Sequence, residues 1–221
     1  MESMMVYLFS GGSTPKPKVV YVEGNVGAGK SEAMAAMKDC LKKRGYTVML
    51  FVEETETWEH EHLLQDLYAQ PNSKAAKRAF EALGPLRQHI ERAHFVEKCG
   101  SEYDFVIMER HPTTTLDVFG ADSAVRALFN TVHASFPFMA PPQTTIYVKA
   151  SPSNCLERII KRGRECESSI DLAFIKAIDT KHGIMMLDRR TEGRVVIAVD
   201  SNLMTAKEVA EKKCADLLLS L

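Results

Sequence analysis

The chain has 221 residues, of which 45% are hydrophobic and 26% are charged. This is the composition of an ordinary globular protein, and it excludes a disordered chain, a collagen-like chain and a coiled coil. The 28 basic and 29 acidic residues give a formal charge of −1, so no overall basic field indicates binding to nucleic acid or to a membrane surface.

The length is typical of one domain, and we expect a single domain over residues 18–221. Residues 1–17 are expected to form a flexible tail, because residues 10–17 are rich in Gly, Ser and Pro. No apolar run reaches the roughly 20 residues that a membrane-spanning helix needs. The five cysteines lack the spacing of a disulfide framework or of a zinc site, which favours a cytosolic or nuclear protein with reduced thiols.

Short apolar runs without polar alternation predict strands that are buried on both faces. They are residues 18–23, 47–52, 105–108, 144–148 and 194–199. Residues 30–44 carry apolar side chains at helical intervals, and Gly45 ends this predicted helix. The pattern predicts an α/β fold in which helices cover a parallel sheet. Because polar residues follow each strand, we expect one ligand site at the carboxyl edge of that sheet.

The segment after the first strand, GNVGAGKS, fits the phosphate-binding pattern G-x-x-x-x-G-K-[ST] and lies between a predicted strand and a predicted helix. Its glycines let backbone N–H groups face a phosphate, and the helix N-terminus adds partial positive charge. Lys30 is expected to reach the β- and γ-phosphates of ATP, and the Ser31 hydroxyl to contact Mg²⁺. The predicted ATP-binding residues of this loop are Gly24, Asn25, Val26, Gly27, Ala28, Gly29, Lys30 and Ser31.

Four segments in the same order make the chain resemble the deoxyribonucleoside kinase family, which includes the herpesvirus thymidine kinases. They are VEGNVGAGKS at 22–31, EETETW at 53–58, ERHP at 109–112 and the Arg-rich run at 158–167. ERHP is closer to the herpesvirus branch than to the cellular one. The resemblance covers about residues 18–200. It implies a P-loop kinase fold with strand order 2-3-1-4-5 and helices on both faces, an Arg-rich lid at about 161–168, and a homodimer.

The resemblance also implies the chemistry, in which the γ-phosphoryl group of ATP moves to the 5′-hydroxyl of a deoxynucleoside. Glu53, directly after the second strand, is the expected catalytic base, and the alternative is a solvated carboxylate in an acidic run. Trp58 is expected to border the base pocket, although it can also simply fill the core. Glu109 is expected to hold Mg²⁺ and Arg110 to orient the 5′-oxygen or the phosphates; an exposed ion pair is the alternative.

The Arg-rich run places four cations in the seven positions from 158 to 164. We expect Arg158 to bind ATP, and Arg162 and Arg164 to stabilise the charge that develops during transfer. A basic solvated helix face is the alternative interpretation. Glu167 aligns with a family residue that contacts the sugar hydroxyl. Tyr68 aligns with a family Tyr that shares this contact with the sugar hydroxyl. The alternative is that Tyr68 is an ordinary aromatic residue of an amphipathic helix.

Two positions are candidates for the residue that recognises the nucleobase by hydrogen bonds. The family uses a Gln to read pyrimidines, but the aligned residue here is Glu81, which when ionised only accepts hydrogen bonds and better suits guanine. Gln88 lies seven residues on, close to the same helical face. We expect thymidine as the substrate, with Gln88 as its reader.

Two other functions stay open. A monophosphate kinase of the thymidylate kinase type shares the phosphate loop, but it usually carries a cation after the second strand, where this chain has EETETW. A non-catalytic nucleotide-binding protein is expected to lack one of the catalytic side chains, whereas Lys30, Ser31, Glu53 and the lid arginines are all present in this sequence. The expected partners are a small-molecule nucleoside and a second copy of the chain, with no nucleic acid and no membrane. The expected location is the cytoplasm, or the cytoplasm or nucleus of a host cell if the source is a virus.

Overall fold

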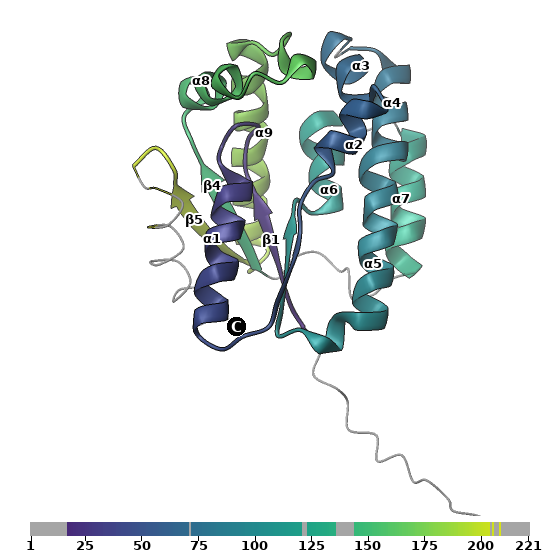
Figure 1. The fold of residues 1–221 in the computed structure, drawn as a ribbon. Helices are drawn as coiled ribbons and strands as arrows, with labels where there is room; N and C mark the ends of the chain where they lie inside the picture. Colours follow the sequence, from purple (N-terminus) through teal and green to yellow (C-terminus); the bar gives the residue numbers. More distant parts are fainter. Residues whose placement is uncertain are drawn as a thin grey trace, which may run out of the picture.

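The computed structural model describes residues 17–70, 72–120, 123–135, 144–203, 205 and 208. The described residues form a five-stranded parallel sheet of order β2-β3-β1-β4-β5 with helices on both faces (Figure 1). This is the predicted fold class. The predicted tail lies outside the described residues except for Pro17, and the extent of the domain to residue 221 stays a prediction.

Each predicted apolar run forms a strand, with bounds that differ by at most one residue. The strands are β1 (Lys18–Glu23), β2 (Val48–Phe51), β3 (Phe105–Glu109), β4 (Thr144–Lys149) and β5 (Val195–Asp200). β1 is central, because Val20 pairs with Ile107 of β3 on one side and with Thr144 of β4 on the other. The loop after β1 is therefore flanked by the ends of both neighbours.

The helix that follows β4 begins and ends at residues that cap it. Ser151 accepts a hydrogen bond from Asn154 N, and Pro152 occupies the first turn of the following helix. Gly163, with a φ of 69°, ends that helix in the left-handed conformation. The helices are α1 (Lys30–Lys43), α2 (Thr55–His60), α3 (Leu63–Ala69), α4 (Lys74–Glu81), α5 (Arg87–Cys99), α6 (Pro112–Thr114), α7 (Ser123–Ser135), α8 (Pro152–Arg162) and α9 (Leu172–Thr191).

Successive side chains of the central strands enter two different cores, as expected for a sheet covered on both faces. Val20 and Val22 pack with α1 residues such as Met34, whereas Tyr21 packs with α5 residues such as Val96. On the α5 side of the sheet, Tyr147 of β4 packs against α9. The two layers hold the strand ends in fixed positions, which is what the site at the carboxyl edge requires. Within the described residues, no helix has the length and apolarity needed to cross a bilayer.

Candidate active site

A cleft of about 870 Å³ opens at the carboxyl ends of the strands. In Figure 1 this edge of the sheet lies at the top, between α8 and helices α2 to α4. The cleft is lined by the phosphate loop, by residues 52–58 after β2, by Glu109 and Arg110 after β3, and by cations of α8 and the turn beyond it. The structure thus brings the polar residues that follow β1, β2 and β3 together in one cleft, as the sequence predicted, whereas Lys149 of β4 and Asp200 of β5 do not line it.

The phosphate loop packs against α8 and is hydrogen-bonded to α9. Gly27 has a φ of 74°, and a Cβ atom there would lie 2.5 Å from Cys155 O, so a side chain would displace the loop from α8. Asn25 Nδ2 donates to Ile175 O of α9 at 2.9 Å, and Asn25 Oδ1 accepts from Val26 N at 2.8 Å. These contacts hold the loop backbone in a single curve before a phosphate arrives.

Lys30 and Glu109 lie side by side at the base of the cleft. Lys30 Nζ donates to Asn25 O at 3.1 Å and lies 3.6 Å from Glu109 Oε1. Burial lowers the pKa of Lys30, and Arg110 lowers it further. Burial works against the charge of Glu109, but Lys30, Arg110 and the Glu53 N–H lower the pKa of this carboxyl below its ordinary value. Glu109 is therefore an ionised carboxylate beside the phosphate loop.

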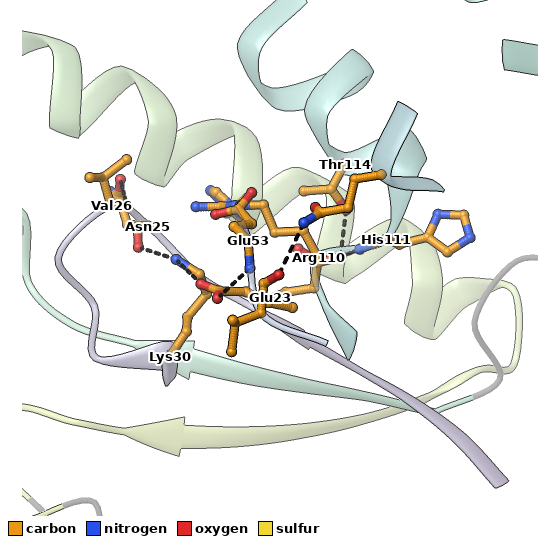
Figure 2. Close-up of polar contacts among 12 residues, drawn as sticks. Glu23, Asn25, Val26, Lys30, Glu53, Arg110, His111 and Thr114 are labelled. Atoms are coloured by element: carbon orange, nitrogen blue, oxygen red, sulfur yellow. Dashed lines mark hydrogen bonds and ion pairs between the residues drawn. The ribbon is translucent and has the colours of Figure 1, made fainter. Parts of the chain in front are cut away.

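Glu53 and Arg110 form an ion pair in the same cleft, with Arg110 Nε 3.0 Å from Glu53 Oε1. The Glu53 backbone N–H also donates to Glu109 Oε2 at 3.1 Å. Arg110 adopts a φ of 58°, in the left-handed region that residues other than glycine seldom occupy. Its N–H donates to Val22 O at 3.0 Å, and its guanidinium lies 5.4 Å from the centre of the Phe119 ring. Figure 2 shows Lys30, Glu53 and Arg110 grouped beside Glu23.

A buried network that the sequence analysis did not predict supports the turn after Arg110. Glu23 Oε1 accepts from His111 N at 2.9 Å and from the Thr114 hydroxyl (Figure 2). It also accepts from both terminal nitrogens of Arg189 at 3.3 Å. Glu23 and Arg189 are almost fully buried. Breaking such a pair leaves an uncompensated charge, so the network ties β1, the turn after β3 and α9 into one unit.

One wall of the cleft is built around Trp58, whose side chain is buried. Its ring meets Phe80 edge to face with centroids 5.4 Å apart. Gly84 lies against the ring, because a Cβ atom there would be 3.2 Å from Trp58 Cε2. Gly84 belongs to a π-helical turn at Ala82–Leu86, between α4 and α5, that also contains Pro85. Trp58 therefore fills a small core and also lines the cleft, and its role at a base pocket stays a prediction.

A small cavity of about 20 Å³ continues behind Trp58 and Glu53, and Gln88, Arg92 and Arg110 also line it. Gln88 Nε2 donates to Val52 O at 3.1 Å, and Arg92 donates to the same oxygen at 2.7 Å and to Glu109 O at 2.9 Å. Arg92 was not predicted. Glu81 is buried and lines neither this cavity nor the larger cleft.

The predicted lid residues face the cleft but are bound to other protein groups in this state. Arg162 forms a two-pronged ion pair with Glu167, with N–O distances down to 2.6 Å, and Arg164 lies 3.7 Å from the same carboxylate. Arg158 donates to Ala28 O at 3.2 Å and to Ser201 O at 2.7 Å, so it supports the phosphate loop from behind. Tyr68 packs edge to face on Phe174, and burial raises the pKa of its hydroxyl.

Most of the predicted site residues line this cleft, while their chemical roles stay predictions. Gly24, Asn25 and Ala28 belong to the phosphate loop without lining the cleft, Gln88 lines the small cavity, and Glu81 lines neither. The supporting residues that the sequence analysis missed are Glu23, Arg92, Arg189 and His182, whose Nε2 lies 3.2 Å from Arg110 NH1. One signal was available for Glu23, because a carboxylate at the end of a solidly apolar strand must have a buried partner. The partner itself had no local signature.

Comparisons with known proteins agree with this geometry. The family model described as "Deoxynucleoside kinase" matches residues 20–217. The chain is similar to the deoxyguanosine kinase of Dictyostelium discoideum, at 28% identity over 195 residues, covering 84% of this chain and 64% of that enzyme. It is also similar to a fowlpox virus protein named a probable deoxycytidine kinase, at 27% identity over 180 residues, covering 75% of this chain and 70% of the viral one. The matched stretch thus spans less than two thirds of the Dictyostelium enzyme.

Proposed function

The chain belongs to the deoxynucleoside kinase family, and we propose that it transfers the γ-phosphoryl group of ATP to the 5′-hydroxyl of a deoxynucleoside. The products are ADP and the nucleoside 5′-monophosphate. The observation that carries this proposal is the pairing of Glu53 with Arg110 at 3.0 Å, in the same cleft as the phosphate loop and Lys30. A base, a cation for the acceptor oxygen and a phosphate cradle therefore face one space.

Each group has a distinct task in this proposal. The transition state of phosphoryl transfer is loose, so catalysis depends mainly on positioning and charge neutralisation. Lys30 and the loop N–H groups hold the phosphates of ATP, and Glu53 accepts the proton of the 5′-hydroxyl. Arg110 orients the acceptor oxygen and holds Glu53 in place.

The residues also fit Mg²⁺. The Ser31 hydroxyl and the ionised Glu109 carboxylate are the oxygen ligands that this ion prefers, and both line the cleft. When bound, Mg²⁺ supplies charge neutralisation at the β- and γ-phosphates.

The wall of the cleft favours a neutral acceptor over a monophosphate. Glu53, Glu54 and Glu56 line it, and the sequence has no cation from 53 to 58. The carboxylates would repel an acceptor phosphate, which supports a nucleoside kinase over a kinase of the thymidylate type. The intact set of Lys30, Ser31 and Glu53 supports an enzyme over a non-catalytic nucleotide-binding protein.

We propose thymidine as the substrate and Gln88 as the residue that reads its base. Gln88 lines the small cavity behind Trp58, and its Nε2 is held by Val52 O. In that orientation Oε1 can accept from thymine N3–H, while the second hydrogen on Nε2 can donate to O4. The two relatives named above carry the names of deoxyguanosine and deoxycytidine kinases, so the base preference needs a direct test.

Gln88→Ala is expected to lower kcat/KM for thymidine by about 10- to 100-fold, because a buried hydrogen-bonding partner is lost. Glu81→Gln is the matched control and should leave the preference unchanged, since Glu81 lines neither cavity. A coupled ADP-release assay with the four deoxynucleosides and their monophosphates measures both. A wild-type preference for deoxyguanosine that disappears in Glu81→Gln would overturn the thymidine assignment and make Glu81 the reader.

Arg162→Ala and Arg164→Ala are each expected to lower kcat by about 10²-fold while raising the KM for nucleoside much less, since their contacts strengthen in the transition state. To act on ATP, Arg162 must exchange its present pairing with Glu167 for the phosphates. Lys161→Ala is the control, because Lys161 lines the same cleft on α8. An unchanged kcat in both Arg variants would contradict the catalytic role and support the alternative interpretation, in which this segment is a basic solvated helix face.

We also propose a homodimer that buries the outer face of α5 and α7. These two helices pack together through His89 and Phe129, whose rings stack with centroids 6.1 Å apart. Leu83 and Ile90 lie seven residues apart before and within α5, and Leu128 lies on α7; all three are exposed large apolar residues. Exposed apolar residues gathered on neighbouring helices are typical of a protein–protein interface.

A further inference from the structure

The guanidinium of Arg110 is held from two sides, and only one of them belongs to the predicted site. Glu53 binds its Nε, and His182 of α9 lies on the other side, with Nε2 3.2 Å from Arg110 NH1. His182 is fully buried, and its ring stacks on Tyr147 with centroids 6.3 Å apart. We propose that His182 is a positioning residue for phosphoryl transfer, which accepts a hydrogen bond from Arg110 and so fixes this cation beside Glu53. This inference rests on the proposed kinase function.

The contacts of the ring determine where its proton lies. His182 Nδ1 is 3.0 Å from Ile178 O, and a carbonyl oxygen can only accept a hydrogen bond. Nδ1 therefore carries the hydrogen, and Nε2 keeps its lone pair. A guanidinium can only donate, so Arg110 NH1 donates to Nε2. Both nitrogens of the neutral ring are thereby satisfied.

The charges around His182 keep it neutral. Burial lowers the pKa of His182 well below its ordinary value, and Arg110 lowers it further. The other charged groups that act on it are also cations, Lys30 of α1 and Arg189 of α9, and the titratable group packed on its face is Tyr147 of β4. A neutral acceptor holds the guanidinium without cancelling its charge, whereas a second carboxylate would form another ion pair with it.

The backbone of Arg110 explains why a second support is needed. Its φ of 58° is a conformation that only surrounding contacts maintain, here the Val22 O bond and the Glu23 network behind His111. Those contacts fix the start of the side chain, and His182 fixes its tip. Without His182, the guanidinium is expected to swing towards Glu53 and bind both carboxylate oxygens. That would make Glu53 a weaker base and misplace the cation at the acceptor oxygen.

Three substitutions at one position test this. His182→Leu removes the acceptor and is expected to lower kcat about 10- to 100-fold, the scale of an ångström-sized misplacement, with the KM for ATP little changed. His182→Gln places an amide oxygen near the position of Nε2 and should recover kcat to within about threefold, whereas the shorter His182→Asn should not. Met186→Leu, a volume-conserving change one turn along α9, is the control and should leave kcat unchanged. If the Leu variant does not fold, the Gln and Asn pair gives the same answer.

Two further measurements separate positioning from a structural role. In an Arg110→Ala background, His182→Leu should cause no additional loss of kcat, because the group it positions is gone. In the wild type, the ring ¹⁵N spectrum should show a neutral, Nδ1-protonated His182 from about pH 8 to pH 5, and Arg110→Ala should raise its pKa. Equal kcat in folded Leu and wild-type proteins, full additivity, or a protonated ring would overturn the proposal. The spectrum remains decisive even if no nucleoside is phosphorylated, which would refute the kinase function alone.

Discussion

Replacing Glu53 with Gln is expected to lower kcat by about 10²- to 10⁴-fold, the usual contribution of a general base, while ATP affinity changes little. The Glu53 side chain lines the cleft, is 16% exposed and lies 3.0 Å from Arg110 Nε. A Gln Oε1 can still accept that hydrogen bond, so the substitution removes the basicity of the carboxylate and keeps its shape. Single-turnover phosphoryl transfer measures the chemical step, and titration with a non-hydrolysable ATP analogue measures binding.

The neighbouring residue offers a matched control for this prediction. Glu54 lies in the same acidic run and also lines the cleft, but it starts α2 without making a side-chain capping bond. Glu54→Gln should keep kcat within about twofold of wild type. If Glu54→Gln is the damaging change and Glu53→Gln is not, the assignment of the base is wrong by one residue.

The parts of this molecule that were predictable are those with a local cause. Strands that are covered on both faces are solidly apolar, so the apolar runs of the sequence located each strand to within one residue. The phosphate loop was predictable because Gly27 and Lys30 serve one contiguous backbone curve. The strand order was implied by the family resemblance, since apolar runs do not indicate which strands are neighbours.

The supporting contacts of the site were not predictable, because their partners are distant in sequence. Glu23 and Arg189 are 166 positions apart, and Arg110 and His182 are 72 apart. Arg189 and His182 have no distinguishing signal in their own segment, because both lie on a long helix of mixed polarity. Only the packing of α9 across the sheet shows that they converge on the turn after β3. Gln88 and Glu81 show the same limit, since a π-helical turn lies between them and shifts the helical faces from ideal spacing.

Lys30 is the second position where a large effect is expected. Its ammonium group is buried, donates to Asn25 O at 3.1 Å and lies 3.6 Å from Glu109 Oε1. Burial disfavours the charge of this ammonium group and lowers its pKa, so the charged form needs an anionic partner. The γ-phosphate of ATP is a stronger partner than one carboxylate at 3.6 Å. We therefore expect Lys30 to leave Glu109 for the phosphates during catalysis, which also frees Glu109 oxygens for Mg²⁺.

Lys30→Ala should accordingly lower kcat by about 10²- to 10³-fold or more, the loss seen when one preorganised charge-stabilising group is removed. Lys30→Met keeps most of the packing volume and should lose as much, which separates the charge from cavity effects. Lys43→Ala, in the last turn of the same helix and exposed, should behave as wild type. Circular dichroism melts establish that each variant is folded. Turnover within tenfold of wild type in folded Lys30→Ala would contradict the phosphate role of this loop, whatever the result at Glu53.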